Sequence, residues 1–145
     1  MRFLLCRHAK AVSASGSTGD FERVLSEKGR RDAVVVRGRL KEHGFLPEKV
    51  FSSSAKRAVE TASIVFPDTD IVLIDALYHS SGEGVVEFLR SIDNDCFAVV
   101  GHNPSMEEAV FSLTGRLYSM GTSDCIAFEG DWENGFEFLW RVGKD

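Results

Sequence analysis

The sequence predicts an α/β fold of the three-layer sandwich type, in which helices cover both faces of a mostly parallel central sheet. Four times along the chain, a short apolar run is followed by a segment whose apolar residues recur at helical spacing. Such alternation is typical of parallel strands joined by helices. Two further strand-like runs, at 125–128 and 136–142, flank a turn region at 130–135 and predict a C-terminal hairpin. The length of 145 residues fits a single domain spanning 1–145.

The four parallel strands are expected to be short and buried on both faces, and they lie at 3–6, 50–51, 71–74 and 97–100. A loop of small residues is expected at 11–19. The first helix is expected from Ser26, with a buried face that consists of Gly29, Ala33, Val36 and Leu40. The second helix is expected to carry a stripe of alanines and Val65 at 55–65, and one of the serines at 52–54 is expected to cap it.

Capping residues indicate where the last two helices begin. Ser80 and Glu83 have the spacing of a capping box, in which the two residues bond each other's backbone N–H groups. Asn103 is expected to cap the fourth helix, with Pro104 in its first position and Gly115 at its end.

Composition and charge exclude several functional classes. The formal net charge is −5, with a sequence pI of about 5.4, whereas nucleic-acid binding usually needs a basic face. No run approaches the roughly 18 consecutive apolar residues of a membrane helix, and the N-terminus becomes polar too soon for a secretion signal. We therefore expect a cytoplasmic protein without membrane or nucleic-acid partners. Cys6, Cys96 and Cys125 are expected to be reduced core thiols, because they lack the spacing of a zinc site.

Unusual polar residues follow three of the predicted strands. Arg7 and His8 come after the first strand, 52–57 after the second, and 101–103 after the fourth. Sites in open α/β sheets form beyond the carboxyl ends of the strands, and parallel strands bring these ends to one edge. We therefore expect two arginines and two histidines to gather there.

This set of side chains suits a phosphoryl group. Guanidinium groups bind phosphate oxygens in a bidentate manner, and helix N-termini add N–H donors. A neutral imidazole nitrogen can attack phosphorus, so covalent catalysis is consistent with the pattern. His43 is interpreted as a structural residue in the last turn of the first helix, whereas the place of His79 stays open.

Four segments resemble motifs of the histidine phosphatase superfamily, also called phosphoglycerate mutase-like, and in particular its small SixA-like phosphohistidine phosphatase branch. They are Arg7-His8-Ala9, the segment 53–62 around Arg57, the segment 101–105 around His102, and the segment 20–29. The resemblance runs from residue 1 to about residue 128. Ala9 and Val24 depart from the glycine and proline that the family usually has at these positions.

The resemblance implies a phosphoglycerate mutase-like fold and a role for each matching residue. His8 would be the nucleophile, Arg7 and Arg57 would clamp the phosphoryl oxygens, and His102 would complete the pocket. Neither a metal nor another cofactor is implied. Substrate contacts are expected from Arg23, Ser53 and Asn103.

The general acid is the least defined part of the expected site. Glu83 is the nearest candidate by position, although the capping box is its simpler interpretation. An imidazole leaving group can depart without a strong acid, which favours a phosphoramidate substrate. Because the loops are short, the pocket is expected to be open to a phosphohistidine on a protein partner, such as a phosphotransfer domain or a sugar-uptake phosphocarrier.

Several other functions share parts of this sequence pattern. A small-molecule phosphomonoesterase of the same superfamily and a phosphate-binding module without turnover remain alternatives, and a mutase is disfavoured by the open pocket. A cysteine-based phosphatase needs an arginine six residues after Cys6, where Val12 stands. A metal-dependent phosphatase would need paired carboxylates near the histidines, and the histidines of this sequence have none at the usual spacing. The sequence does not predict an oligomeric state.

Overall fold

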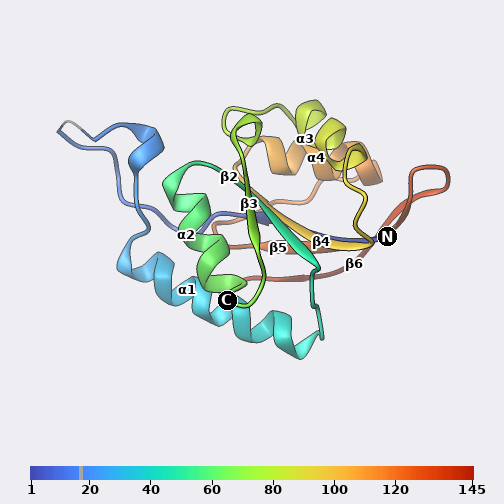
Figure 1. Cartoon of the computed structure of the whole chain (residues 1–145), viewed down its shortest axis with the longest axis horizontal. Helices are drawn as coiled ribbons and strands as arrows, with labels where there is room; N and C mark the ends of the chain where they lie inside the picture. The colour runs from blue at the N-terminus through green and yellow to red at the C-terminus, as the bar shows by residue number, and fades with distance from the viewer. Residues whose placement is uncertain (17) are drawn as a thin grey trace.

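A six-stranded sheet runs through the middle of the molecule and is covered by two helices on each face, as Figure 1 shows. The structure is a computed structural model that describes residues 1–16 and 18–145. It confirms the predicted three-layer α/β sandwich and the C-terminal hairpin. The strands are β1 (Arg2–Arg7), β2 (Lys49–Ser53), β3 (Ile71–Ile74), β4 (Cys96–Gly101), β5 (Cys125–Asp131) and β6 (Gly135–Val142).

The strand order is β3-β2-β4-β1-β5-β6. Strands β1 to β4 pair in parallel, so their carboxyl ends lie along one edge of the sheet. Strand β5 is antiparallel to β1, and β6 returns beside β5 as the second strand of the hairpin. The helices between and after the parallel strands are α1 (Glu27–Glu42), α2 (Lys56–Val65), α3 (Gly82–Arg90) and α4 (Ser105–Thr114).

Two apolar cores lie on opposite faces of the sheet, because successive side chains of a strand point in opposite directions. On β1, Leu4 and Cys6 pack toward α1 and α2, whereas Phe3 and Leu5 pack toward α3 and α4. Both faces of the parallel strands are therefore buried, which explains why these strands are continuously apolar. Phe3 also stacks on Phe97 of the neighbouring strand, with ring centroids 5.3 Å apart.

The helix starts differ from expectation at α2, α3 and α4; at α4 the residue before the first turn is Pro104, and Asn103 is not the cap. The residue before α2 is Ala55, and no serine caps this helix directly; instead, the Ala55 N–H donates to Ser53 Oγ at 3.2 Å. The cap of α3 is Ser81, which accepts a hydrogen bond from the Gly84 N–H at 3.0 Å. The predicted capping box of Ser80 and Glu83 is therefore wrong: the cap is the next residue, Ser81, and Gly84 has no side chain that could complete a box. The serine cap of α1, Ser26, is confirmed.

The connection between β1 and α1 is a loop whose two ends are joined by an isolated antiparallel bridge between Ala11 and Leu25. Between these residues lies the 3₁₀ turn η1 (Asp20–Glu22). The loop that was predicted at 11–19 includes residue 17, which lies outside the described residues. A second 3₁₀ turn, η2 (Asp75–Leu77), follows β3. Both turns lie at the carboxyl end of the parallel strands, where the site was predicted.

The three cysteines are free thiols, but only two of them belong to the core. Cys6 and Cys125 face each other across β1 and β5, with sulfur atoms 2.8 Å apart. Burial raises the pKa of Cys6 well above its ordinary value. Cys96 is half-buried at the start of β4, so the expectation of a core position is wrong for this residue.

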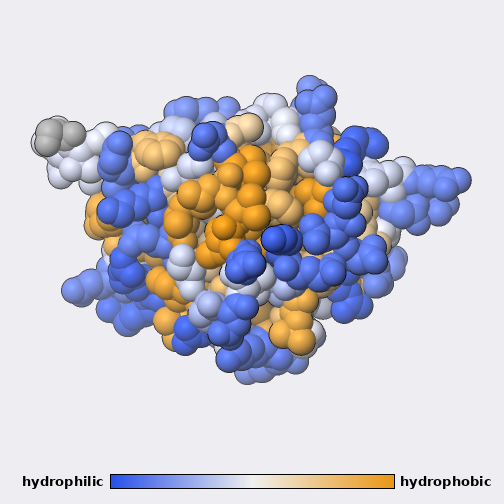
Figure 2. Space-filling view, viewed as in Figure 1, coloured by the Kyte–Doolittle hydropathy of each residue, from blue (hydrophilic) through white to orange (hydrophobic). Residues whose placement is uncertain are grey.

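Strand β3 forms one edge of the sheet, and Figure 2 shows apolar side chains gathered over it. Leu73 on this strand is 52% exposed. Within the part of the chain that the structure describes, none of the helices combines the length and the apolar character that crossing a bilayer requires.

The first loop packs closely against α1 at Gly29. A Cβ atom there would lie 2.0 Å from the Lys10 carbonyl oxygen, whereas a Cβ at Gly38 of the same helix would meet nothing within 4 Å. We expect Gly29→Ala to lower the free energy of unfolding by about 1–3 kcal/mol through overpacking. The matched change Gly38→Ala should raise it by about 0.5–1 kcal/mol, because alanine is the better helix former. Urea denaturation measures both, and equal stability of the two variants would contradict the close approach.

Candidate active site

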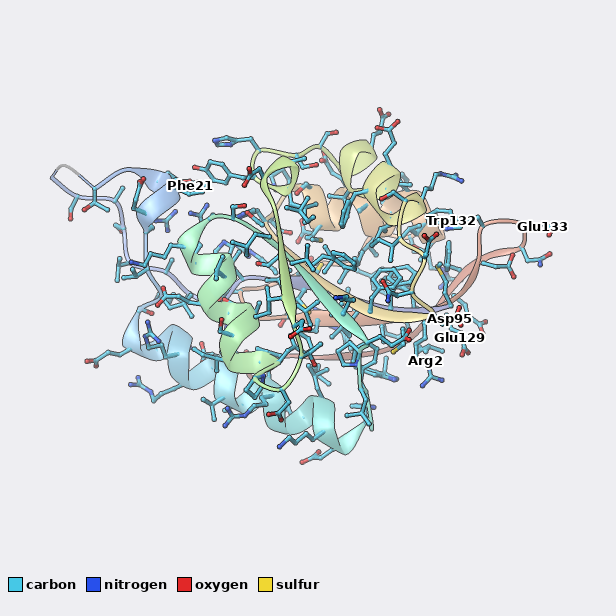
Figure 3. All side chains as sticks on the ribbon, viewed as in Figure 1. Arg2, Phe21, Asp95, Glu129, Trp132 and Glu133 are labelled. Carbon is cyan, nitrogen blue, oxygen red and sulfur yellow. The ribbon has the colours of Figure 1, made fainter. Side chains whose placement is uncertain are left out.

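The predicted functional residues lie at the carboxyl ends of β1, β2 and β4. Arg7 of β1 is in register with Gly101 of β4, and Ser52 of β2 is in register with Val100 of the same strand. Figure 3 shows Phe21, on η1, at this end of the molecule, far from Arg2 and the other residues labelled at the opposite end. The parallel register therefore brings together residues that are about 50 positions apart in the sequence.

His8 is held rigidly directly after β1. Its N–H donates to the Gly101 carbonyl oxygen at 3.0 Å, and its own carbonyl oxygen accepts from the Ser123 N–H at 3.0 Å. Its ring atom Nδ1 lies 2.7 Å from the Ala9 carbonyl oxygen. Because a carbonyl oxygen only accepts, Nδ1 carries the hydrogen and the lone pair of the neutral ring lies on Nε2.

Ala9 is compatible with the site although the family usually has glycine there. Its backbone does not adopt a positive φ angle, so the Cβ atom causes no conformational strain. The Ala9 N–H donates to Thr61 Oγ1 at 2.9 Å, and this hydroxyl donates to the Arg57 carbonyl oxygen at 2.7 Å. Thr61 therefore ties the segment after His8 to the first turn of α2, a contact that the sequence analysis missed.

His102 follows β4 and is oriented by Ser53. The distance between His102 Nε2 and Ser53 Oγ is 2.8 Å. We assign Ser53 as the donor, because its oxygen accepts the Ala55 N–H and its hydroxyl hydrogen has no other acceptor among the described residues. With this assignment the ring hydrogen lies on Nδ1, a buried atom without a hydrogen-bond partner among the described residues.

The two histidine rings lie side by side, with centroids 5.2 Å apart and planes tilted by 59°. Burial lowers the pKa of His8 from 6.5 to about 4, and the charges of Arg57 and Arg7 act in the same direction. Burial also lowers the pKa of His102 to about 3. The next largest contributions come from His8 and Arg57, which lower this pKa further. Both rings are therefore neutral at pH 7.

Arg57 covers the lone pair of His8. Its Nε atom lies 3.3 Å from His8 Nε2, and its side chain is almost completely buried. From the other side, Nη1 donates to the Asp20 carbonyl oxygen at 2.8 Å and Nη2 donates to Asp20 Oδ2 at 3.1 Å. The guanidinium group is thus fixed between the imidazole and the η1 turn.

Asp20 is a site residue that the sequence analysis did not identify. Besides Arg57, its carboxylate accepts hydrogen bonds from the Tyr78 hydroxyl at 2.6 Å and from Arg23 Nη1 at 2.9 Å. These bonds from Tyr78 and Arg23 hold the pKa of Asp20 well below its usual range, and the carboxylate raises the pKa of Tyr78. Asp20 is therefore ionised under ordinary conditions. The only available signal was the position of Asp20 three residues before Arg23 in a segment that resembles a family motif.

A cavity of about 300 Å³ opens at this place. It is lined by Asp20, Arg57, Tyr78, His79, Ser80, His102, Asn103, Pro104 and Ser105. His8 is 8% exposed and lies behind this lining, in contact with two of its members, Arg57 and His102.

Comparison with known proteins assigns the family. Residues 3–78, slightly more than half of the chain, match the sequence model of the histidine phosphatase superfamily (branch 1). The chain belongs to this superfamily. Among curated proteins, it is 28% identical over 153 residues to an uncharacterized chloroplastic protein of Arabidopsis thaliana, a match that covers 93% of the chain and 70% of the relative.

Solved structures narrow the assignment to the SixA-like branch. The crystal structure of SixA from Agrobacterium tumefaciens superposes with a TM-score of 0.89 at 25% identity and covers 98% of this chain and 97% of the other. A protein histidine phosphatase SixA complexed with tungstate superposes with a TM-score of 0.86 at 19% identity, covering 99% and 97%. The expected family and fold are confirmed, and the protein is a phosphatase of the hydrolase class.

The remaining residues that the sequence analysis selected have different places in this phosphatase. Asn103 lines the cavity, but it does not cap α4, whose first turn follows Pro104; its Nδ2 donates to the Met120 carbonyl oxygen at 2.9 Å. Arg7 Nη1 donates to the same oxygen at 3.0 Å, while Arg7 Nε is buried without a partner in the described part of the chain. Arg23 reaches the cavity only through Asp20.

Ser53 and Glu83 also do not line the cavity. The Ser53 hydroxyl contacts His102 and the start of α2, and its role in binding substrate stays a prediction. Glu83 is exposed on the first turn of α3 and lines a neighbouring groove instead. The structure therefore does not bring Glu83 to the histidine pair, and its role as an acid stays a prediction.

The other two histidines, His43 and His79, lie in different surroundings. His43 stacks on Trp140 with ring centroids 4.0 Å apart, away from the cavity. His79, whose place the sequence left open, lines the cavity beside Tyr78 and adopts a positive φ of 60°. Across residues 1–16 and 18–145, no three His, Cys, Asp or Glu side chains are grouped so that they could hold a metal ion.

The arrangement suits a tetrahedral anion at the His8–His102 pair. Arg7 Nε and His102 Nδ1 are buried donors without partners among the described residues, and Arg57 adds a second guanidinium. Buried donors that lack partners cost free energy until a ligand binds them. The site can therefore hold a phosphoryl group next to an imidazole nitrogen with a free lone pair.

The lowered pKa of His8 predicts a pH-dependent stability. The unfolded chain binds a proton at this residue below pH 6.5, whereas the folded protein does so only near pH 4, so the free energy of unfolding falls as the pH is lowered through this window. Between pH 7 and 5 we expect His8 to account for a loss of about 2 kcal/mol. Urea denaturation of His8→Asn should show a smaller loss than the wild type. His43→Asn is the control, and an unchanged pH dependence in His8→Asn would contradict the buried neutral ring.

Proposed function

We propose that this phosphatase removes the phosphoryl group from a phosphohistidine on a partner protein, through a covalent intermediate on His8. The observation that carries the proposal is the state of His8: a buried, neutral ring whose Nδ1 hydrogen is held by a carbonyl oxygen, so that the lone pair lies on Nε2. We further propose that residues 1–145 act as one catalytic domain, since His102 lies beyond the matched segment 3–78 and yet adjoins His8.

The first step transfers the phosphoryl group to the enzyme. Oxygens of the incoming group accept hydrogen bonds from Arg57, Arg7 and the Nδ1–H of His102. Recruitment of Arg57 removes its N–H from His8 Nε2 and frees the lone pair, which attacks phosphorus. The bond between phosphorus and the substrate imidazole breaks, and its electron pair stays on the leaving nitrogen. The fixed guanidinium groups stabilise the charge on the equatorial oxygens.

The second step regenerates His8. A water molecule attacks phosphorus, the bond to Nε2 breaks with its electron pair returning to Nε2, and both hydrogens of the water leave with the product as dihydrogen phosphate. No residue needs to change its protonation state permanently, because the hydrogen on Nδ1 remains bound to the Ala9 carbonyl oxygen throughout. The backbone acceptor thus holds the same tautomer before and after each turnover.

The acid–base character of the cavity favours a phosphoramidate over a phosphate monoester. Among the described residues, Asp20 is the only carboxyl group that lines the cavity, and its bonds to Tyr78 and Arg23 keep it ionised. An ionised carboxylate has no proton for an alkoxide leaving group. A phosphohistidine that is protonated on its other ring nitrogen releases neutral imidazole without such a proton.

The likeness to SixA proteins supports this substrate class. One of them is a protein histidine phosphatase that binds tungstate, a tetrahedral oxyanion with the shape of phosphate. Proteins with other substrates share the fold at lower similarity, such as a phosphoserine phosphatase from Entamoeba histolytica with a TM-score of 0.73. The substrate must therefore be decided by the chemistry of the cavity and by experiment.

A substrate panel tests the proposed specificity. We expect kcat/KM for a phosphohistidine-bearing protein to exceed kcat/KM for sugar, nucleotide and aryl phosphates by at least 100-fold. Because no enzyme acid is required, Glu83→Gln should leave kcat on phosphohistidine within about twofold of the wild-type value. Rapid cleavage of small monoesters without action on phosphohistidine would refute the proposal, and so would loss of phosphohistidine turnover in Glu83→Gln.

The covalent step is tested at His8. His8→Ala should abolish turnover while inorganic phosphate still binds, because the arginines and His102 remain. The wild type, mixed with substrate labelled in the phosphoryl group and denatured in alkali, should carry label on His8. His43→Ala, which changes a histidine away from the cavity, should keep both activity and label. Near-normal turnover by His8→Ala would exclude the covalent route.

A further inference from the structure

A second hollow adjoins the catalytic cavity. It has a volume of about 670 Å³ and lies between the first turn of α3, the exposed side of α4 and the segment 117–119. We call it the α3–α4 groove. Pro104 lines both the groove and the catalytic cavity, so the two hollows lie next to each other at the start of α4.

The groove exposes large apolar side chains. Leu117 is 87% exposed and Phe111 is 48% exposed, and both line the groove together with the half-buried Tyr118. Isolated exposed apolar residues are common on protein surfaces, but a cluster in a concave site indicates a place where another molecule binds.

Three carboxylates line the same groove: Glu83, Glu107 and Glu108. None of them forms a salt bridge with a lysine or arginine within the described residues. Two of them fix the walls of the groove, because Glu108 Oε1 accepts from the Gly82 N–H at 3.2 Å and Glu107 Oε2 accepts from the Met120 N–H at 2.7 Å. The groove is therefore preformed and negatively charged.

One wall of the groove is connected to the catalytic arginine. Met120 directly follows the segment 117–119, and its carbonyl oxygen accepts hydrogen bonds from Arg7 and Asn103. A segment bound in the groove thus lies next to the residues that bind the phosphoryl group. One substrate could therefore place its phosphoryl group in the catalytic cavity and a neighbouring segment in the groove.

We propose that the α3–α4 groove binds a segment of the phosphorylated partner protein that carries apolar and basic side chains near the phosphohistidine. Apolar residues would cover Phe111 and Leu117, and lysine or arginine would pair with the carboxylates that lack a counter-ion. An acidic partner surface would be repelled by the three carboxylates of the groove. The inference rests on the proposed function, because it takes the occupant of the groove to be the substrate itself.

Two synthetic phosphohistidine peptides of equal length test the groove. One has lysine and leucine residues flanking the phosphohistidine, and the other has glutamate and serine. We expect the wild-type KM to be at least tenfold lower for the basic, apolar peptide, and high salt should reduce this difference. The double variant Phe111→Ser/Leu117→Ser should lose most of the preference, with kcat/KM for free phosphoimidazole unchanged.

Leu46→Ser is the matched control, because Leu46 is 81% exposed and does not line the groove; it should keep the peptide preference. Equal KM values for both peptides in the wild type, or an unchanged preference in the double variant, would overturn the docking proposal and leave the proposed function intact. Cleavage of neither peptide nor phosphoimidazole, combined with cleavage of an aryl phosphate, would overturn both.

Discussion

Two imidazole rings that stay neutral inside the protein are the feature on which the site depends. His8 and His102 are more than nine-tenths buried next to guanidinium groups, and both conditions disfavour a protonated ring. Neutrality keeps a lone pair on one ring and a hydrogen-bond donor on the other. The acceptor for His8 is a backbone carbonyl oxygen and the partner of His102 is a serine hydroxyl, so neither ring needs a charged neighbour to set its tautomer.

Asp20 balances the positive charge of this site. Its carboxylate bonds to Arg57 and Arg23 at once, and its neighbour Tyr78 donates a third hydrogen bond. A phosphoryl group that enters the cavity therefore meets an Arg57 that is already oriented but still has N–H groups free to donate.

The two faces of the sheet contribute differently to the function. Helix α2 and the first loop supply part of the catalytic cavity, since Arg57 belongs to α2 and Asp20 to the η1 turn of the loop, and both line it. Helices α3 and α4, on the other face, form the groove beside it. The catalytic cavity therefore draws residues from both layers of the sandwich, because Ser105 of α4 also lines it, whereas the groove belongs to the layer of α3 and α4.

Local patterns in the sequence determined the elements of the fold and much of the site. The apolar runs and helical spacings identify the strands and helices, Ser26 identifies the start of α1, and the polar residues after the strands identify His8, Arg57 and His102. These predictions succeed because side-chain period and helix capping act over a few residues. Parallel strands then bring the strand ends together by topology alone.

Only the tertiary structure decided the contacts between distant segments. Asp20 bonds to Arg57, 37 residues away, and to Tyr78, 58 residues away, and no local pattern encodes such pairs. The place of Glu83 also depended on the packing of α3 against α4, which turned it toward the groove rather than the cavity. Ser81 rather than Ser80 caps α3, because cap position is set by where the backbone turns into the helix. Residue types show which chemistry is available, whereas packing decides which groups meet.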